Sequence, residues 1–330
     1  GDKSLSKRDF KRVASPLSKF GAKFKLTKNF SLPLTIQGSK KIKSIKYYEK
    51  RGSAQCKSSV MLAAMRADGT TYIKAKKSRD HTEKMMKNLN LPIRVIKRKN
   101  HDIIQIKKIK RIKPINYNIP SDISSGAFFI VLTALSDNSE LIIKNVNINP
   151  SRIGVITILR KMGVNIVLQN KKIYKGERIA DIKVNSSKLI KPINCPSTLV
   201  TSAIDEFLII FLMAAKANGI SYFKGLAELN KKESPRLKWG SKILNKMGIK
   251  NITTKSSIKI FGNPKLKINK KIIIKNYLGD HRVFMTSVIA ALSFGGLWEI
   301  HDSKAIRTSF PNFLNIINQL KKNEKKKKNN

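Results

Sequence analysis

Residues 122–163 read DISSGAFFIVLTALSDNSELIIKNVNINPSRIGVITILRKMG and contain one complete structural unit. The apolar run that follows Asp122 has the composition of a buried helix, and the residues at 140–144 favour a strand. The pattern at 151–162 predicts an amphipathic helix, which the following glycine ends. This stretch therefore predicts a helix, a strand and a second helix in that order.

The same order recurs along the chain, and this recurrence decides the fold class. Its copies begin near Ser53, Asp122, Asp205 and Asp280. Strand-like alternations at 258–261 and 266–269 lie between copies, so each copy is expected to add strands to a sheet that its helices cover. We predict an α/β protein built of repeated units.

The chain length and a proline-containing segment between two copies predict two domains. A chain of 330 residues with 41% hydrophobic residues can bury more than one core, and residues 113–121 carry two prolines between copies. We expect a partial N-terminal domain at 1–116 and a C-terminal domain of three repeats at 117–322. Residues 323–330 form a like-charge run and are expected to be a disordered basic tail.

The net charge of +48 favours polyanions or small anionic substrates, and its sign alone does not choose between them. The excess of lysine comes with abundant isoleucine and asparagine, a mixture that AT-rich codons also produce. The apolar runs are too short or too interrupted to span a bilayer, and Cys56 and Cys195 are too few for a disulfide framework. A cytoplasmic protein without a metal site or cofactor fits these features best.

Polar residues stand directly before three apolar helices, at Asp122, at Asp205 with Glu206, and at Asp280. Each is interpreted first as an N-cap, whose side-chain oxygen accepts backbone N–H bonds. Helix N-termini also present free N–H groups and a positive dipole end, which suit phosphate and carboxylate groups. Three such starts together favour a site for an anionic substrate.

Several short motifs, in this order and at this spacing, carry a resemblance to a known family. They are Ser53-Ala54-Gln55, Ser78-Arg79-Asp80-His81-Thr82-Glu83, Asn149-Pro150-Ser151-Arg152, Lys232-Glu233-Ser234 with Arg236, Gly279-Asp280-His281-Arg282, and Thr308-Ser309-Phe310-Pro311. The chain resembles the 5-enolpyruvylshikimate-3-phosphate (EPSP) synthases, or 3-phosphoshikimate 1-carboxyvinyltransferases. The resemblance implies two domains of inside-out barrels made of repeated α/β units. It also implies transfer of the enolpyruvyl group of phosphoenolpyruvate to shikimate 3-phosphate, with release of phosphate, in the shikimate pathway of aromatic amino-acid biosynthesis.

The start of the chain is similar to two different family segments. Residues 1–4, Gly-Asp-Lys-Ser, look like the family's opening signature, whose lysine contacts phosphoenolpyruvate. The residues around Arg8 are instead similar to a later segment that carries an arginine for phosphoenolpyruvate, and Ser53 follows too soon for the opening motif. Arg8 is therefore assigned to that later arginine and Lys3 to coincidence. On this interpretation an N-terminal segment of the enzyme is missing, and the chain alone is expected to be inactive or nearly so.

The resemblance also implies the site residues. Asp205 is expected to act as the base toward the acceptor hydroxyl, Lys232 to position that hydroxyl, and Glu233 to shuttle protons at the methylene carbon. The substrate-binding residues it implies are Arg8, Ser53, Ala54, Gln55, Ser78, Arg79, Arg236, Arg282 and Arg307. The chain departs from the family pattern at three places: Pro235 replaces the usual aspartate, Asp9-Phe10 replaces the usual Pro-Met after Arg8, and Arg307 stands where many relatives carry lysine.

A non-catalytic remnant of the family, which the missing start makes plausible, is one alternative, and two more remain open at this point. One is the sister enolpyruvyl transferase that modifies a UDP-amino sugar, UDP-N-acetylglucosamine, in cell-wall synthesis. The other is a basic nucleic-acid-binding protein, which only the charge supports, since no aromatic-rich strand stands out in the sequence. The favoured interpretation expects phosphoenolpyruvate and shikimate 3-phosphate as small-molecule partners, no specific nucleic acid, no membrane, and a monomer when complete.

Overall fold

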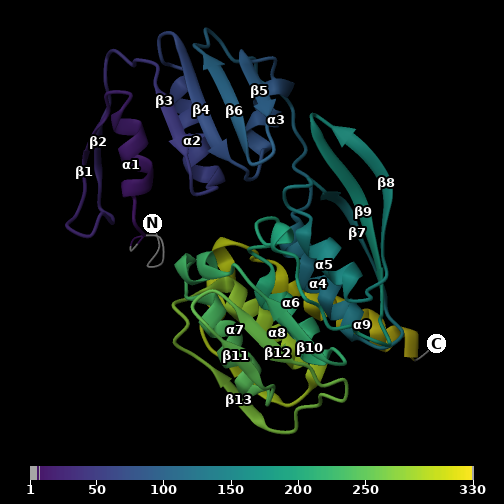
Figure 1. The fold of residues 1–330 in the computed structure, drawn as a ribbon. Coiled ribbons are helices and arrows are strands. Elements are labelled where there is room, and N and C mark those ends of the chain that lie inside the picture. Colours follow the sequence, from purple (N-terminus) through teal and green to yellow (C-terminus); the bar gives the residue numbers. More distant parts are fainter. Residues whose placement is uncertain (1–5, 7, 329–330) are drawn as a thin grey trace. The chain divides into compact units, whose positions relative to one another are not determined.

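The protein is described here by a computed structural model that covers residue 6 and residues 8–328, so Lys3 lies outside the described residues (Figure 1). The chain divides into two compact units. Unit 1 takes the chain to Pro120 together with Ile148–Arg152 and Lys171–Ile179. Unit 2 takes Ser121–Asn147, Ile153–Asn170 and the chain from Ala180 onward. Residues 111–120 form neither helix nor strand.

Unit 1 is built around one mixed sheet. Its elements are α1 (Lys11–Ser18), β1 (Lys23–Lys25), β2 (Thr35–Gln37), β3 (Lys46–Glu49), α2 (Ala54–Ala64), β4 (Thr70–Lys76), α3 (His81–Asn88), β5 (Ile93–Lys97) and β6 (His101–Lys107). The large sheet has the order β3-β4-β6-β5, while β1 and β2 pair separately. Alternate residues of β4 and β6 are buried, because one face of the sheet packs against α2 to form the core of this unit.

Unit 2 contains most of the remaining elements. They are α4 (Ile123–Leu135), β7 (Glu140–Asn147), α5 (Gly154–Lys161), β8 (Ile166–Tyr174), β9 (Glu177–Asn185), η2 (Ser197–Leu199), α6 (Phe207–Lys216), β10 (Ile220–Phe223), η3 (Ala227–Lys231), α7 (Arg236–Lys246), β11 (Asn251–Thr253), β12 (Ile258–Phe261), β13 (Lys271–Ile274), α8 (His281–Phe294), β14 (Leu297–Ile300), η4 (Ser303–Thr308) and α9 (Phe313–Lys328). The turn of the β8–β9 hairpin belongs to unit 1.

The sheets repeat one topology, which confirms the predicted fold class of repeated α/β units. In the orders β4-β6-β5, β7-β9-β8 and β10-β12-β11, the first strand of each copy pairs with the third. In a further copy β13 pairs in parallel with β14 across α8, as β3 pairs in parallel with β4 across α2. The helix between two parallel strands covers their sheet, as a parallel crossover requires.

The three helices α4, α6 and α8 pack against one another at the centre of unit 2. They are apolar almost all round, and every residue from Phe207 to Ala215 of α6 is buried. A helix without a polar face is stable only where neighbours cover every side of it, so the sheets and the remaining helices must surround this trio. Gly240 lets α7 pack closely against α6, since a Cβ there would lie 2.7 Å from the ring of Phe211.

Several local expectations are corrected by the structure. The residues at 266–269 form no strand, and α5 begins at Gly154, three residues after the predicted start. The helix α9 extends to Lys328, into the stretch for which the like charges predicted disorder. Lysine is a good helix former, and buried Phe313 and Ile317 anchor the first turns of α9, so the helix continues into the basic run. In the part of the chain that the structure describes, no helix is long and apolar enough to cross a membrane.

Candidate active site

The arginine that opens α7 is the centre of a network of buried charges in unit 2. Arg236 has only 2% of its surface exposed and Asp280, the N-cap of α8, has 0%. The Arg236 Nε donates to Asp280 Oδ2 at 2.9 Å and its Nη2 to Asp280 Oδ1 at 3.2 Å, a two-pronged pair. The same guanidinium also pairs with Glu233 and, at 3.5 Å, with Asp205. One arginine therefore holds three carboxylates from separate segments.

Asp205 connects this network to a lysine and a second arginine. Lys232 Nζ lies 3.0 Å from Asp205 Oδ1, and Arg282 Nη1 donates to the Asp205 carbonyl oxygen at 2.8 Å. Arg282 Nη1 also lies 3.5 Å from the carboxylate of buried Glu206, which accepts a hydrogen bond from Ser124. These contacts bring the N-termini of α4, α6 and α8 together, so the helix starts noted in the sequence converge on one place.

The N-cap interpretation of these starts is confirmed at two of them and wrong at the third. Asp122 accepts from the Ser124 N–H at 3.2 Å, and Asp280 accepts from the Arg282 N–H at 2.9 Å. At the start of α6 the N-cap is Glu206, whose side chain makes no capping bond, and Asp205 turns to Lys232 and Arg236 instead. Hydrogen bonds between ionised groups are stronger than those to a neutral N–H, so these two cations hold the Asp205 carboxylate.

Electrostatics in the cluster favour the charged forms of its central pair. Burial alone would favour neutral groups, but the Arg236 guanidinium and its hydrogen bonds hold the pKa of Asp280 below the usual aspartate range. Asp280 in turn raises the pKa of Arg236 against the effect of burial. Burial, with Arg282 beside it, lowers the pKa of His281, so this first residue of α8 is favoured as neutral imidazole.

Unit 1 contains a second polar cluster, at the N-terminus of α2. Ser53 is the N-cap of α2, and its hydroxyl accepts from the Cys56 N–H at 3.2 Å. The buried Lys57 ammonium lies 2.5 Å from buried Glu83 and donates to the Arg79 carbonyl oxygen at 2.8 Å. This buried pair connects the first turn of α2 to residues 78–79, and the resemblance implies substrate-binding residues in both segments. The Ser78 hydroxyl oxygen is buried and has no hydrogen-bond partner among the described residues.

A buried carboxylate shapes the turn before Ser53. Glu49, with 2% of its surface exposed, accepts the N–H groups of Arg51 at 3.1 Å, Gly52 at 2.6 Å and Ser53 at 3.0 Å. Gly52 has φ +75°, a conformation that glycine adopts without strain. The Glu49 side chain thus occupies a concave nest of backbone amides and fixes the direction in which α2 starts.

We predict that Glu49→Gln loosens this turn and weakens binding of any phosphate held by Ser53 and Gln55. A glutamine amide turns its NH₂ group toward backbone donors, so at least one N–H loses its acceptor, at a cost of about 1–3 kcal/mol. Isothermal titration with shikimate 3-phosphate measures the loss of affinity, and Glu140→Gln on β7, whose carboxylate is exposed, is the control. Equal affinity in both variants would contradict the prediction.

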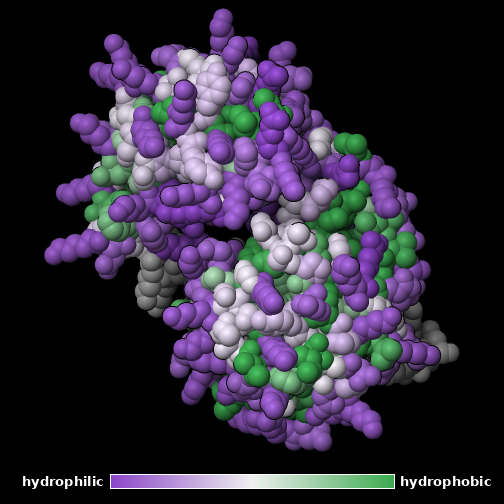
Figure 2. Space-filling view, viewed as in Figure 1, coloured by the Kyte–Doolittle hydropathy of each residue, from purple (hydrophilic) through white to green (hydrophobic). Residues whose placement is uncertain are grey.

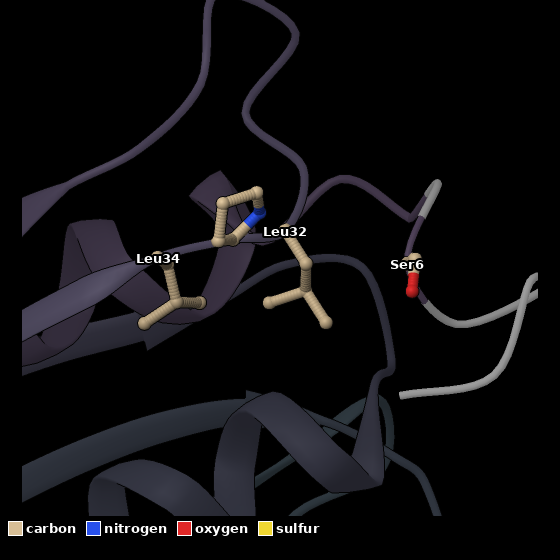
Figure 3. Close-up of a pocket in the computed structure, with 4 residues that line it drawn as sticks. Ser6, Leu32 and Leu34 are labelled. Carbon is tan, nitrogen blue, oxygen red and sulfur yellow. The ribbon is translucent and has the colours of Figure 1, made fainter.

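The other predicted substrate-binding residues occupy different settings. Ala54 is half-buried in the first turn of α2 and Gln55 is exposed there, while Arg8 is half-buried just before α1, which packs against α2. Close to Arg8, a cavity of about 450 Å³ is lined by Ser6, Leu32, Pro33 and Leu34 (Figure 3). Among the described residues, its lining consists of three apolar side chains and one serine.

Arg307 is exposed on η4, which packs against α8, and it forms no ion pair with the network among the residues that the structure describes. Sequence reasoning did not assign roles to Glu49, to Glu206, or to Asp280 as the partner of Arg236. The buried Glu206 had one visible signal, since it follows Asp205 directly at an apolar helix start. Within the described residues, no group of histidine, cysteine, aspartate or glutamate side chains is placed to hold a metal ion.

Comparison with known proteins gives the same class as the fold. The structure is similar to that of the enolpyruvyl transferase NikO from Streptomyces tendae, with a TM-score of 0.72 over 94% of this chain and 71% of that one, at 12% identity. At that identity the likeness concerns the fold alone. The chain therefore has the fold of the enolpyruvyl transferases.

Closer similarities define the family. The EPSP synthase (3-phosphoshikimate 1-carboxyvinyltransferase) family matches residues 1–317. A 3-phosphoshikimate 1-carboxyvinyltransferase from Ruthia magnifica is 41% identical over 97% of this chain and 72% of its own length. The EPSP synthase structure from Acinetobacter baumannii superposes with a TM-score of 0.83 at 36% identity, over 97% of this chain and 72% of that one. This chain belongs to the EPSP synthase family.

Proposed function

We propose that this chain transfers the enolpyruvyl group of phosphoenolpyruvate to the hydroxyl of shikimate 3-phosphate and releases phosphate. Membership of the EPSP synthase family supports this activity. The observation that carries it is the cluster at the start of α7 in which Arg236 pairs with Asp205 and Glu233, and Lys232 pairs with Asp205. It unites proton carriers with cations that suit an anionic substrate.

The reaction needs two proton carriers at different atoms. The acceptor hydroxyl oxygen forms a bond to C2 of phosphoenolpyruvate while its proton leaves, and C3 of the methylene gains a proton. The resulting adduct then breaks its C–O bond to phosphate and loses a proton from C3, which restores the double bond. We assign the hydroxyl proton to Asp205, with Lys232 holding that hydroxyl, and the C3 protons to Glu233.

The carboxylate positions in the cluster support this division of roles. Asp205 is half-buried, and its oxygen is 3.0 Å from Lys232 Nζ, so a hydroxyl that displaces the ammonium slightly would meet both groups. Glu233 accepts a hydrogen bond from Arg236 Nη2, the nitrogen that also donates to Asp280, whereas Nη1 of the same guanidinium lies near Asp205. Glu233 must gain and lose a proton in one catalytic cycle, and Arg236, which stays charged throughout, can hold it in place in both states.

The anionic groups of the substrates have separate candidate partners in each unit. In unit 2, Arg282 and the amides at the helix N-termini are proposed to bind phosphoenolpyruvate. In unit 1, Ser53, Gln55, Ser78 and Arg79 are proposed to bind the phosphate of the acceptor, and the unpartnered Ser78 hydroxyl supports this assignment. These roles derive from the family and from the local geometry of each unit.

The test is release of inorganic phosphate from phosphoenolpyruvate. The chain alone is expected to release little or no phosphate. Completed by a family-like N-terminal segment, it is expected to release phosphate only when shikimate 3-phosphate is present, with formation of an enol ether that mass spectrometry detects. UDP-N-acetylglucosamine as acceptor is expected to give no phosphate. Turnover with the UDP-sugar and none with shikimate 3-phosphate would instead support the sister transferase.

We predict that Arg282→Lys weakens phosphoenolpyruvate binding more than it slows turnover. Lysine keeps the charge but cannot make two parallel hydrogen bonds, and a hydrogen bond to a charged group contributes about 1.5–3 kcal/mol. The KM for phosphoenolpyruvate should rise roughly tenfold to a hundredfold, with kcat changed only a few-fold. Arg111→Lys, at an exposed position outside helix and strand, is the control. A fall in kcat at unchanged KM would show that Arg282 acts in the transition state alone.

A further inference from the structure

One face of the large sheet of unit 1 packs against α2 and forms the core of that unit. No described element forms a core against the other face. Alternate residues of β4 and β6 pack inward, among them Ile73, Ala75, Ile104 and Ile106, and the residues between them point to the opposite side. We call that side the outer face. Its residues from β3 and β4 are Lys46, Tyr48, Thr70, Tyr72, Lys74 and Lys76, and those from β5 and β6 are Arg94, Ile96, His101, Ile103, Gln105 and Lys107.

The outer face is strongly cationic. Five of its residues are lysine or arginine and none is aspartate or glutamate. Lys46, Lys74, Lys76, Arg94 and Lys107 form no ion pair with any described residue. In Figure 2 hydrophilic side chains project densely from the part of the molecule that contains these strands. Unneutralised cations on one flat face are complementary to a polyanion.

Two tyrosine rings lie among these cations on adjacent strands. Tyr48 of β3 is 55% exposed and Tyr72 of β4 is 42% exposed. In the parallel register Tyr48 lies opposite Lys74, and Tyr72 lies opposite Lys46, so the rings are diagonal neighbours. Strand spacing of ~4.8 Å and a rise of ~3.3 Å per residue place their Cα atoms about 8 Å apart. Lys74 Nζ stands 5.2 Å from the Tyr48 ring centroid, which keeps that ring and a cation side by side.

We propose that the outer face binds single-stranded nucleic acid, with bases stacked on Tyr48 and Tyr72 and phosphates paired with the surrounding lysines. Aromatic rings on the open face of a four-stranded sheet are a known way of holding unstacked bases, and every base offers a π-face. Neither ring belongs to the substrate sites proposed above, so this inference does not depend on the enzymatic function. The sequence did not reveal this pair of aromatic rings, because the two tyrosines are far apart in the chain and only the fold places them on adjacent strands.

The chemistry of the face favours a single strand over other polyanions. A duplex has its bases already stacked, so it could use the cations but not the rings. A membrane surface would call for protruding Trp, Phe or Leu side chains, whereas the aliphatic members here, Ile96 and Ile103, are half-buried. Stacking plus phosphate contacts therefore predicts weak sequence preference, strong salt dependence and a preference for single strands.

The test uses fluorescence anisotropy of labelled 12-mers of oligo(dT) and oligo(U), a 12-base-pair duplex, and vesicles that contain phosphatidylserine. We expect either single strand to bind more tightly than the duplex. Tyr48→Ala with Tyr72→Ala should lower single-strand affinity roughly tenfold or more, while the two Phe substitutions retain it, since a phenyl ring still stacks. The Phe variant also controls for folding.

A charge variant separates this face from the general basicity of the chain. Lys46→Gln, Lys74→Gln and Lys107→Gln together should reduce the slope of log affinity against log salt by about 2, because each phosphate contact contributes about 0.7 for single strands. Lys265→Gln, Lys267→Gln and Lys270→Gln remove the same charge from exposed positions of unit 2 and should change the slope little. Equal effects of the two triple variants would overturn the proposal. So would duplex or vesicle binding as tight as single-strand binding, or competition by shikimate 3-phosphate.

Discussion

In the Glu233→Gln variant, kcat should fall by about 10²–10⁴-fold, with the KM values for both substrates changed only a few-fold. Glutamine keeps the size of the side chain and can still accept a hydrogen bond from Arg236, but it cannot take up and return a proton. Loss of a proton carrier acts on the transition state, so kcat and kcat/KM should decrease together. Phosphate release under saturating substrates measures the effect.

A matched control for this variant lies five positions earlier. Glu228 is an exposed glutamate on η3 whose carboxylate lies 2.9 Å from Lys231 Nζ. Glu228→Gln removes the same charge beside the site and should leave kcat within a factor of two or so, because an exposed ion pair contributes ~0–1 kcal/mol. If Glu233→Gln retains most of its turnover, or loses only substrate affinity, the role assigned to Glu233 is wrong.

The second large effect concerns stability. Arg236→Met should destabilise unit 2 by about 3–5 kcal/mol, because it leaves the fully buried Asp280 carboxylate without its cation. Trp239 and Trp298, the two tryptophans of the chain, both lie in unit 2, so tryptophan fluorescence during urea unfolding reports on that unit. Lys231→Met, which breaks the exposed pair with Glu228, is the control and should change stability by less than about 1 kcal/mol.

The destabilisation caused by Arg236→Met should depend on pH in a defined direction. The folded-state pKa of Asp280 is lowered, so its ion pair stabilises the wild type above the unfolded aspartate pKa of about 3.9, and that contribution is lost as pH falls through the folded-state pKa. In Arg236→Met the buried carboxyl is favoured as the neutral acid. The difference in unfolding free energy between the two proteins should therefore narrow between neutral pH and about pH 4. If the difference in unfolding free energy is the same at both pH values, Asp280 is not the buried carboxylate that loses its cation in the variant.

The repeated fold could be predicted because each copy has local signals. Apolar helix patterns, alternating strands and closing glycines lie within a few tens of residues of one another, and local pattern decides local structure. The helix α4, which follows Asp122, and the strand β7, which begins at Glu140, agree with those signals. Residues 266–269 show the same alternation but form no strand. Alternation alone cannot predict whether a neighbouring strand is available for pairing.

The pairing within the candidate site could not be predicted from pattern. Arg236 and Asp280 are far apart in the chain, and only the packing of α7 against α8 brings them to 2.9 Å. Glu49 was missed for the opposite reason, since its partners are the next few backbone amides and no side-chain pattern marks them. The roles of Asp205, Lys232 and Glu233 came from the family resemblance and stay predictions. The structure adds that Asp205 and Glu233 share the Arg236 guanidinium and that Lys232 pairs with Asp205.

The all-apolar trio of α4, α6 and α8 has a consequence for hydrogen exchange. Amide protons in the middle of α6 have no route to solvent while its neighbours remain packed, so they should exchange only when unit 2 unfolds as a whole. Candidate catalytic Asp205 lies at the start of α6, and Asp280, the partner of Arg236, lies at the start of α8. Protection from hydrogen exchange at α6 should therefore report the free energy that keeps the catalytic side chains in place. A variant that lowers this protection should position these side chains less accurately even while the protein remains folded.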